Sequence, residues 1–397
     1  MVNVASGQTS EDRYSRLRLI PWWDQSLIAA CRVLVIGCGA LGNEILKNLA
    51  LLGFKQIAAV DMDLVEASNL SRSVLFRPGD IGTHKAVAAA RASNALVKDA
   101  HVHPIVANVM RDCGLGLFDW ADIIIAGLDN REARLWINRA AWKMGKPWID
   151  GAIEGINGVA RVFVAGQAPC YECTLGEVDW AILERRMSCN LLAHRPDAEG
   201  KVPTTPTISS IIAGIQVQEA VKLLHGLPTL AGRGFVFEGL HHSSYTVEYT
   251  ENPDCMSHYT IPEVVRLEEP STSLTPMSLW ERACQDLGTR EAVLEFSREI
   301  IWRLVCPHCG AIEERFAPVG SVAYEEGVCP RDDRRLVVET IHRFTGSEPW
   351  GGRRLNEVGL PLFDVVMARS AVREIGYLME GDRDAVLDNA GQGSGQR

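Results

Sequence analysis

Apolar residues form short runs and helix-like periods over the first part of the chain. Residues 32–36 and 122–126 are nearly continuous apolar runs that end at a glycine, which is typical of strands buried in a parallel sheet. Residues 42–52 and 85–97 lie between them and have the apolar spacing of helices. Strands separated by helices in this way predict a doubly wound α/β sheet.

The same patterns predict the remaining elements of this sheet. Further strands are expected over residues 56–60, 101–106, 147–149, 159–165, 233–238 and 245–249. Further helices are expected over residues 23–30, 132–143 and 208–224. The helix over 208–224 is so apolar that it fits a core or a dimer interface. The predicted fold class is a Rossmann-like doubly wound, mostly parallel sheet with helices on both faces.

The character of the sequence changes after about Cys255. The following segment is rich in charges and holds a second group of cysteines, and the end of the chain is rich in Gly, Ser and Gln. The chain is therefore expected to divide into a first domain with an N-terminal arm and a crossover loop (1–258), a zinc-ribbon-like insert or second domain (259–345), a β-rich piece (346–380) and a flexible tail (381–397).

Composition narrows the class of protein. Of the 397 residues, 47% are hydrophobic and 23% charged, which excludes a globally disordered chain. The net charge of −10 argues against a nucleic-acid partner, because phosphate contacts need clustered cations. No apolar run has membrane-spanning length and the N-terminus lacks a secretory pattern, so a cytoplasmic protein without a membrane partner is expected. Eleven cysteines then indicate thiols and metal sites rather than disulfides.

A glycine-rich turn is the first candidate site. Gly37, Gly39 and Gly42 follow a predicted strand and open a predicted helix, where backbone N–H groups can approach a phosphate. Asp61 ends the next strand, where a carboxylate can accept hydrogen bonds from ribose hydroxyls. These residues indicate a nucleotide only: an NAD-dependent dehydrogenase fits equally well, and so do glycines that merely allow close packing.

Further motifs distinguish these alternatives. In chain order they are Gly42-Asn43-Glu44, the pair Asp61 and Asp63, Ser68-Asn69-Leu70-Ser71-Arg72, Ile81-Gly82-Thr83-His84-Lys85 and residues 127–134. Over residues 13–258 the chain resembles the ubiquitin-activating-enzyme-like adenylyltransferases of the ThiF/MoeB/HesA superfamily. The resemblance implies a homodimer that uses Mg-ATP to adenylate the C-terminal carboxylate of a ubiquitin-like protein ending in glycine.

The resemblance also implies roles for the charged residues. Adenylation joins a carboxylate to the α-phosphate and expels pyrophosphate, so cations must offset charge on the leaving phosphates. Arg72 and Lys85 are expected to supply these cations, and Asn69 is expected to donate hydrogen bonds.

Three further groups are expected near the nucleotide. Asp61 and Asp63 are expected to bind it, Asp61 at the ribose, and Asp129 is expected to hold Mg²⁺. Arg16 matches a family arginine that reaches across the dimer interface into the partner's site. The alternative for Arg16 is a solvated surface charge.

A first zinc site is expected from two separated pairs of residues. Cys170 and Cys173 form a C-x2-C motif, and Cys255 and His258 follow at the distance where the family has a second such pair. Three thiolates and one imidazole form a closed tetrahedral zinc shell. His258 stands where the family usually has cysteine.

A second cluster has no counterpart in the minimal family members. Cys306 and Cys309 form another C-x2-C motif, and Cys329 follows in a pattern that resembles a zinc ribbon. Its fourth ligand stays open between Asp332, which we favour, His308 and His342. A rival arrangement would combine the two C-x2-C motifs in one site, and simple reduced cysteines are a further alternative.

A nucleophile is expected in the crossover segment. Family members that pass the adenylate to a thiol carry a cysteine there, and Cys189 lies in this region beside Arg185 and Arg186, which favour a thiolate. A core cysteine is the alternative interpretation. The remaining cysteines are expected to be packing residues: Cys31, Cys38, Cys113 and Cys284.

These observations together predict an activating enzyme. It would adenylate a ubiquitin-like protein and then hold it as a thioester on Cys189, and residues 260–345 would recruit the carrier or a conjugating enzyme. A bacterial ubiquitin-like conjugation pathway would fit this elaboration. The alternatives are a sulfur-carrier protein adenylyltransferase of thiamin or molybdopterin type, an NAD-dependent oxidoreductase and a non-catalytic scaffold.

Overall fold

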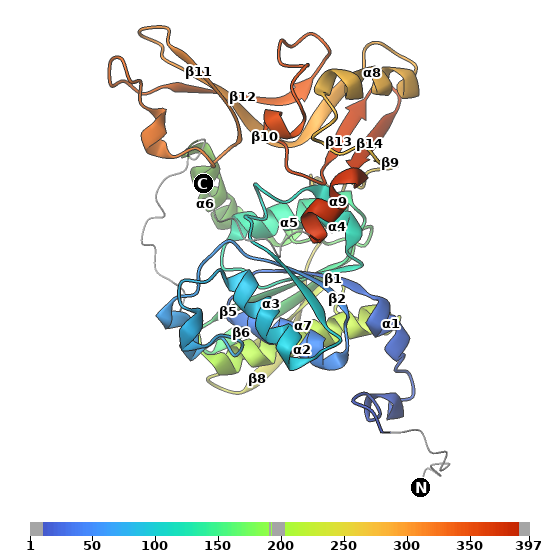
Figure 1. The fold of residues 1–397 in the computed structure, drawn as a ribbon. Coiled ribbons are helices and arrows are strands. Elements are labelled where there is room, and N and C mark those ends of the chain that lie inside the picture. Colours follow the sequence, from blue (N-terminus) through green and yellow to red (C-terminus); the bar gives the residue numbers. More distant parts are fainter. Residues whose placement is uncertain (1–10, 190–191, 193–202, 389–397) are drawn as a thin grey trace.

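The computed structural model describes residues 11–189, 192 and 203–388, with the backbone alone described for residues 184–189. The first domain is built on an eight-stranded sheet of order β3-β2-β1-β4-β5-β6-β7-β8 (Figure 1). Five strands are parallel: β1 (Arg32–Ile36), β2 (Gln56–Val60), β3 (His101–Ile105), β4 (Ile123–Ala126) and β5 (Trp148–Glu154). Three antiparallel strands complete it: β6 (Asn157–Phe163), β7 (Arg233–Glu238) and β8 (Ser243–Glu248).

Helices cover both faces of this sheet, which confirms the predicted fold class. One face packs against α1 (Gln25–Ala30), α2 (Ala40–Leu52), α3 (Lys85–Leu96) and α7 (Pro206–Leu224). The other face packs against α4 (Leu115–Trp120), α5 (Arg131–Lys143) and α6 (Glu177–Cys189). Short 3-10 turns connect them: η1 (Leu17–Leu19), η2 (Ala67–Ser71), η3 (Pro78–Asp80) and η4 (Glu172–Thr174).

Capping residues explain where several of these helices begin. The side chains of Asp24, Asn130 and Thr205 accept hydrogen bonds from the first turns of α1, α5 and α7. The helix α7 packs on α2 and on β5 and β6, as its apolar sequence indicated. In the described parts of the chain, none of the helices combines the length and apolar character needed to span a lipid bilayer.

The second domain is a six-stranded sheet of order β11-β10-β13-β14-β9, with β12 also paired to β10. Its strands are β9 (Val264–Leu267), β10 (Val293–Val305), β11 (Ile312–Pro318), β12 (Val337–Phe344), β13 (Val365–Arg369) and β14 (Glu374–Met379). Its helical elements are α8 (Pro276–Leu287), η5 (Tyr324–Gly327), η6 (Asn356–Val358), η7 (Glu380–Asp382) and α9 (Arg383–Leu387).

The boundary expected at residue 345 falls inside this sheet. The long strand β10 pairs with β13 through Val293–Glu295 and with β11 through Ile300–Val305, and β12 pairs along both parts. The segments expected as an insert and as a separate β-rich piece therefore share one sheet. The two segments differ in composition because β13 and β14 are buried and therefore apolar, whereas the zinc-ribbon-like end carries many charged residues.

The start of the expected tail is also ordered. Residues 381–388 include part of η7 and the helix α9, and the carbonyl of Val386 lies 3.2 Å from Nε2 of His103 on β3. The buried carboxylate of Asp382 accepts hydrogen bonds from the backbone N–H groups of Ser271 and Phe363, each at 3.1 Å. A buried carboxylate that satisfies backbone donors holds this segment against the second domain. Residues 389–397 lie outside the described residues.

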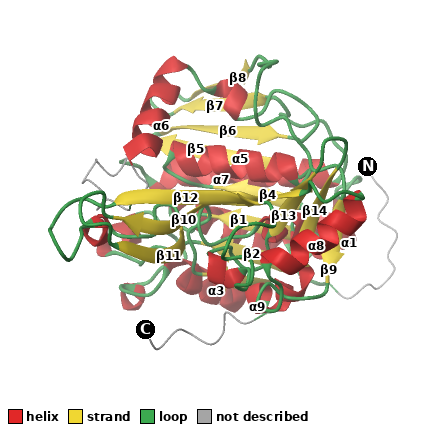
Figure 2. Ribbon diagram, turned by 90° about the horizontal axis from the view of Figure 1, so that it is seen from above, coloured by secondary structure: helices red, strands yellow, loops and turns green. Residues whose placement is uncertain are grey.

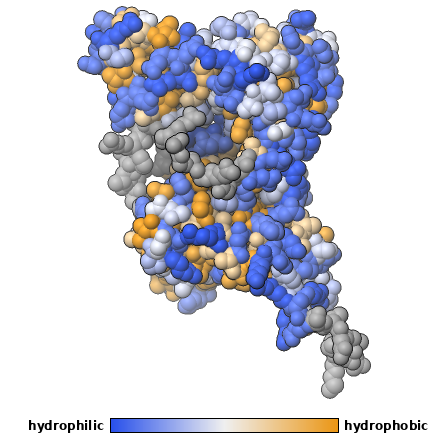
Figure 3. Space-filling view, viewed as in Figure 1, coloured by the Kyte–Doolittle hydropathy of each residue, from blue (hydrophilic) through white to orange (hydrophobic). Residues whose placement is uncertain are grey.

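The two domains pack directly on each other, and the view from above shows the second sheet lying over the α4 and α5 side of the first (Figure 2). The N–H of Gly116 donates to the carbonyl of Phe363 at 2.8 Å, and a Cβ at residue 116 would lie 2.4 Å from that oxygen. Arg298 on β10 donates to the carbonyls of Met110 and Cys113 at 3.0 and 2.7 Å. The face seen in Figure 3 is hollowed between the two domains.

Candidate functional site

A cavity of about 1230 Å³ opens at the carboxyl ends of the parallel strands β1, β2 and β4. This is the edge of a doubly wound sheet where ligands bind, because the strand order reverses there and the following loops separate. Most of the nucleotide-binding residues expected from the sequence line this cavity: Gly37, Gly39, Asp61, Asp63, Asn69, Arg72, Lys85 and Asp129.

The glycines of the turn have different roles. Gly37 has a φ of +91°, and a Cβ there would lie 2.6 Å from the carbonyl of Gly127 on the neighbouring strand. Gly39 precedes α2 and has open space where a side chain would stand. Gly42 does not line the cavity: it is buried, and a Cβ on it would lie 1.9 Å from the carbonyl of Gly37. The structure therefore places Gly42 as a packing residue that closes the turn.

Asp61 is fixed by backbone donors on two sides. Its Oδ2 accepts a hydrogen bond from the N–H of Cys38 at 2.7 Å, and its Oδ1 accepts one from the N–H of Asp63 at 2.8 Å. Burial raises the pKa of Asp61, and the nearby Lys85 and the two backbone donors only partly offset this. The carboxylate is thus oriented toward the glycine turn, with further lone pairs available for a ligand.

The cation expected at Lys85 lies deep in the cavity wall. Its Nζ donates to Oδ2 of Asp63 at 2.7 Å. Burial opposes the charged form, but the attraction of Asp61 and Asp63 is stronger, so the pKa of Lys85 is raised. Lys85 therefore stays an ammonium at neutral pH, beside the open rim where Asp129 is exposed.

The turn η2 positions Asn69 and Arg72. Asn69 is buried in the middle of the turn, and its side-chain oxygen accepts a hydrogen bond from the N–H of Glu66, the residue before the turn, at 2.9 Å. Arg72 donates from Nη1 to the carbonyl of Ser68 at 2.8 Å. Within the described residues no carboxylate forms an ion pair with Arg72, so its guanidinium can bind an anion in the cavity.

A buried ion network under the cavity was not identified from the sequence as a site. Asp150 is fully buried and accepts hydrogen bonds from Nε of Arg134 and from Nε of Arg161, each at 2.9 Å. Arg134 also donates to the carbonyls of Leu128 and Gly151, so it fixes the loop that carries Asp129. Burial opposes ionisation of Asp150, but the two guanidinium groups are stronger and lower its pKa.

The cavity continues along the antiparallel strands. This part was also missed, because its residues carry no recognisable motif: Ala152, Ile153, Glu154, Asn157, Gly158, Val159, Thr204, Val236, Phe237 and Glu238. The returning crossover is held here, since the N–H of Gly155 donates to the carbonyl of Pro203 at 2.7 Å and the N–H of Thr205 donates back at 3.2 Å. The result is a channel that leads from the expected phosphate region along β5 and β6.

The four ligands of the first expected zinc site come together. The Sγ atoms of Cys170 and Cys255 are 3.5 Å apart, and Sγ of Cys173 lies 3.3 Å from Nε2 of His258. All four ligand atoms lie within 4.8 Å of one another, which fits one tetrahedral ion.

Neighbouring side chains support this set of ligands. The amide of Asn138 donates to Sγ of Cys170 at 3.3 Å, and the imidazole of His258 stacks on Trp142 with ring centroids 4.5 Å apart. Nδ1 of His258 lies 3.7 Å from a carboxylate oxygen of Glu251. A carboxylate behind a histidine orients the ring for a metal on its other nitrogen.

The second cluster is built from two turns with the same hydrogen bonds. In the first, the N–H of Cys306 donates to the carbonyl of Ala311, and the N–H of Gly310 donates to that of Cys306. In the second, Cys329 pairs in the same way with Arg334 and Asp333. Both turns need a positive φ, which is +71° at Gly310 and +55° at Asp333. Such repeated turns are called zinc knuckles here, and each presents ligands at its first and fourth positions.

This repetition favours Asp332 among the candidates for the fourth ligand. Asp332 occupies the position in the second knuckle that Cys309 occupies in the first, and its ligand atom lies within 4.8 Å of those of Cys306, Cys309 and Cys329. His308 contacts Asp332 instead, with its Nδ1 3.0 Å from Oδ2. The two groups of ligands are separate, so the geometry does not support the rival arrangement that combined the C-x2-C motifs.

The expected nucleophile lies at the end of a helix that the sequence patterns did not predict. Cys189 is the last residue of α6, and its side chain lies outside the described residues, as do those of Arg185 and Arg186. The cysteines expected to be packing residues are mostly buried. Burial raises the pKa of both Cys31 and Cys113 to about 12 and that of Cys38 well above its usual value. These three thiols are therefore protonated at neutral pH.

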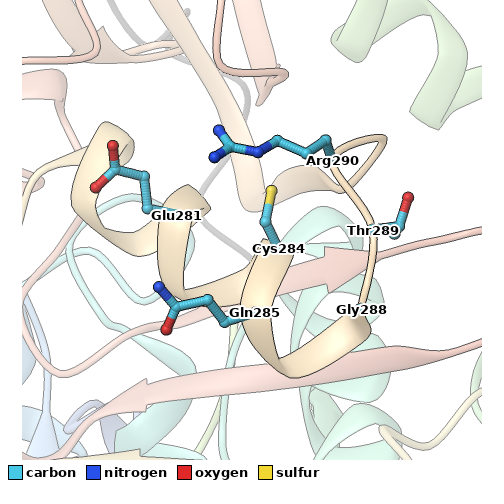
Figure 4. A pocket seen from close by; sticks show the side chains of 6 residues that line it. All are labelled: Glu281, Cys284, Gln285, Gly288, Thr289 and Arg290. Carbon is cyan, nitrogen blue, oxygen red and sulfur yellow. The ribbon is translucent and has the colours of Figure 1, made fainter.

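Cys284 differs from these residues because it is only half-buried. It lies on α8 in the second domain, in a hollow of about 310 Å³ that Arg290, Glu281 and Gln285 also line (Figure 4). Burial raises the pKa of the Cys284 thiol, which argues against a nucleophile.

Arg16 lies outside the cavity of its own chain. It is the residue before η1 in the N-terminal arm, its side chain is 86% exposed, and its nearest acidic partner is Glu11 at 3.9 Å. An extended cation of this kind has no role in its own site, but it is free to contact another molecule.

The part of the chain that forms this cavity matches a known protein family. The sequence model of the ThiF family matches residues 12–257. A structure of Escherichia coli MccB with ATP superimposes with a TM-score of 0.53 at 21% identity, covering 64% of this chain and 75% of that one, and it supports the fold.

Curated relatives agree with this match. The Nedd8-activating enzyme E1 catalytic subunit of Drosophila melanogaster is 42% identical over 158 residues, and the match spans only 35% of that protein and 36% of this chain. The SAMP-activating enzyme E1 of Haloferax volcanii is 31% identical over 255 residues, which cover 62% of this chain and 88% of that protein. The sulfur carrier protein adenylyltransferase of Thermus thermophilus is 29% identical over 259 residues, which cover 62% of this chain and 89% of that protein. With more than half of its length matched by the family model, the chain belongs to the ThiF family.

Proposed function

We propose that this protein uses ATP to adenylate the C-terminal carboxylate of a ubiquitin-like or sulfur-carrier protein ending in glycine. The observation that carries the proposal is the convergence of Asp61, Arg72, Lys85 and Asp129 on one cavity beside the glycine turn. Relatives named as activating enzymes and as an adenylyltransferase support it. An NAD-dependent oxidoreductase is disfavoured, because hydride transfer gives Arg72, Lys85 and Asp129 no role.

The chain's own residues account for the chemistry of this step. A carboxylate oxygen of the carrier attacks the α-phosphorus of ATP, and the bond from that phosphorus to pyrophosphate breaks. Lys85 and Arg72 would stabilise the charge that develops on the leaving phosphates, while Asp61 would hold the ribose. Asp129 would hold Mg²⁺, which neutralises part of the triphosphate charge.

The channel along β5 and β6 fits the carrier's C-terminal tail. Its wall combines small or apolar residues, such as Ala152, Gly158 and Val159, with the polar groups of Glu154 and Asn157. An extended tail ending in glycine could lie along these strands and bring its carboxylate to the α-phosphate.

A second step, transfer to Cys189, also belongs to the proposal. The thiolate sulfur attacks the carbonyl carbon of the acyl-adenylate, a C–S bond forms, the C–O bond to AMP breaks, and AMP leaves with the electron pair. Burial of Cys31, Cys38 and Cys113 supports Cys189, because these thiols cannot serve as the nucleophile. Sulfur-carrier activation is the second candidate, and the Thermus thermophilus relative favours it.

The two cysteine clusters are proposed as structural zinc sites, and the protein as a homodimer in which Arg16 reaches the partner's cavity. Closed shells of four ligands suit zinc sites that hold segments together. The second domain is proposed to recruit the carrier or a conjugating enzyme, because the match to the ThiF family ends at residue 257, before this domain begins.

The proposal is tested by ATP–pyrophosphate exchange in the presence of a small protein ending in glycine. Lys85→Ala and Arg72→Ala should each lower the exchange rate by about 10²–10³-fold, because each removes a cation from the developing charge. Lys98→Ala, at an exposed position outside the cavity, is the matched control and should leave the rate unchanged. Stabilisation of the protein by NAD but not by Mg-ATP would contradict the proposal.

The second step is read separately by mass spectrometry. A reductant-sensitive adduct between carrier and enzyme that Cys189→Ala removes would support conjugation, whereas a thiocarboxylate on the carrier would support sulfur transfer. Unchanged adduct in Cys189→Ala would exclude this cysteine as the acceptor.

A further inference from the structure

Leu192 follows α6 by three residues and lies in the core of the second domain. It is 8% exposed and belongs to a buried cluster whose other members all come from the zinc-knuckle part of the chain. This cluster, called the knuckle core here, consists of Ile301, Leu304, Cys306, Val322, Cys329 and Leu336. Among the described residues, Leu192 is the one member contributed by the first domain.

The side chain of Leu192 packs against Gly327, the last residue of η5. A Cβ on Gly327 would lie 2.3 Å from Cδ1 of Leu192, so a side chain there would force the end of the leucine to shift. Gly327 has no left-handed φ, and its carbonyl accepts a hydrogen bond from the N–H of Leu336 at 2.9 Å. Its missing side chain is therefore explained by the space that Leu192 occupies.

The surface around Gly327 is fixed by neighbouring contacts. Arg335 donates from Nη1 to the carbonyl of Tyr324 at 2.8 Å and lies over the Tyr324 ring, 3.5 Å from its centroid. Two members of the knuckle core, Cys306 and Cys329, are also ligands of the second cluster. The surface that receives Leu192 is thus built on the metal knuckles themselves.

We infer that Leu192 is a positioning residue: its burial against Gly327 attaches the end of α6, and with it Cys189, to the second domain. The inference rests on the proposed thioester step for its catalytic consequence. The nucleotide cavity has none of these residues in its wall. Loss of the contact should therefore impair transfer to Cys189 and leave adenylation intact.

Gly327→Ala tests the inference without changing the chain near Cys189. It should lower the rate of thioester formation by at least about tenfold, because a misplaced nucleophile loses its attack geometry, while ATP–pyrophosphate exchange stays at the wild-type rate. Hydrogen exchange of the full-length protein should be faster at the backbone amides of the last turn of α6. Gly352→Ala is the matched control, because Gly352 lies in the same domain with open space around it.

A double variant makes the test specific to this contact. Leu192→Ala alone should resemble Gly327→Ala, and Leu192→Ala/Gly327→Ala should recover part of the thioester rate, since the alanine at 327 fills space that the leucine vacates. Wild-type hydrogen exchange and thioester rates in both single variants would overturn the inference, as would a parallel loss of pyrophosphate exchange. A wild-type protein that forms no thioester would contradict the proposed transfer step instead, and hydrogen exchange would still decide whether Leu192 holds α6.

Discussion

Asp150 shows at the scale of one residue how the site is built below its surface. Its carboxylate is fully buried between Arg134 and Arg161, and Arg134 in turn fixes the carbonyl of Leu128 beside Asp129. The functional cavity therefore depends on a carboxylate that cannot touch a ligand.

Asp150→Asn should destabilise the protein by about 3–5 kcal/mol, because two buried guanidinium groups lose their counter-charge. A fall in Tm and in the free energy of unfolding from denaturant titration would measure this. Asp179→Asn is the control: it weakens the more exposed pair with Arg131, while an asparagine oxygen can still accept the hydrogen bond from the N–H of Gly176, so stability should change by less than about 1 kcal/mol.

Asp150 should also make the free energy of unfolding depend on pH. The pKa of Asp150 is lower in the folded state than in the unfolded state, so its contribution to stability is complete above about pH 4 and is lost as the pH falls through the folded-state pKa. Asp150→Asn should lose this acid-dependent part of the free energy of unfolding. An identical slope of stability against pH below 4 in both proteins would contradict the assignment.

Most of the residues that line the candidate nucleotide cavity could be predicted because they belong to ordered local motifs. Gly37, Asp61, Arg72, Lys85 and Asp129 each follow a strand end or a short turn, and the topology brings strand ends together. The ion pair between Asp150 and Arg161 could be recognised only once β5 was known to pair with β6, because the two residues stand directly opposite each other in that pairing. The signal that could have indicated them was an aspartate directly after the strand predicted over residues 147–149 and an arginine inside the strand predicted over residues 159–165.

At the scale of elements, the zinc knuckles explain the second cluster. The hydrogen bonds around Cys306–Cys309 and Cys329–Asp332 repeat, so two equivalent turns bring together four side chains that could hold one ion. The sequence could not decide the fourth ligand, because the equivalence of Asp332 and Cys309 appears only in the backbone hydrogen bonds.

The purified protein should contain about two zinc ions per chain, measured by elemental mass spectrometry. Cys173→Ser and Cys309→Ser should each reduce this content to about one, because each removes a ligand from a different cluster. Asp332→Cys should retain both ions. It should release the ion of the second cluster to a chelator more slowly, because a thiolate is a softer ligand than a carboxylate and binds zinc more strongly. Unchanged zinc content in Asp332→Ala would exclude Asp332 as a ligand.

The helices α4, α6 and α8 were not predicted from the pattern of apolar residues. The helix α4 has only six residues, five of them buried, so it lacks the two-faced pattern of a surface helix. The helix α6 carries Glu177 and Asp179 in its first turn and lies in the segment that the family resemblance assigned to the crossover.

At the scale of the whole molecule, the exposed arm with Arg16 and the complete set of cavity residues lie apart on one chain. Family resemblance assigns that arginine to the partner's site, and this arrangement makes the dimer testable by mixing subunits.

Arg16→Ala and Lys85→Ala should each be nearly inactive in pyrophosphate exchange, and their mixture should recover about a quarter of wild-type activity after the subunits exchange. Half of the dimers would be mixed, and in each of these one of the two sites would combine an intact Lys85 with an intact Arg16. A mixture with no more activity than its separate components, under conditions where mixed dimers form, would contradict a shared site.

One strand runs through the second domain from its contact with the first domain to the knuckles. β10 contacts the first domain through Arg298 and leads directly into Cys306 of the knuckles. Eight residues of extended chain span at most about 27 Å, so each degree of tilt at the domain junction would shift the far end by about 0.5 Å. The base of this strand is held by Arg298, which donates to the carbonyls of Met110 and Cys113 and lies over the Trp136 ring. Nearer the knuckles, Arg111 of the first domain donates to the carbonyl of Gly320, so a tilt at the base of β10 would also strain this second contact.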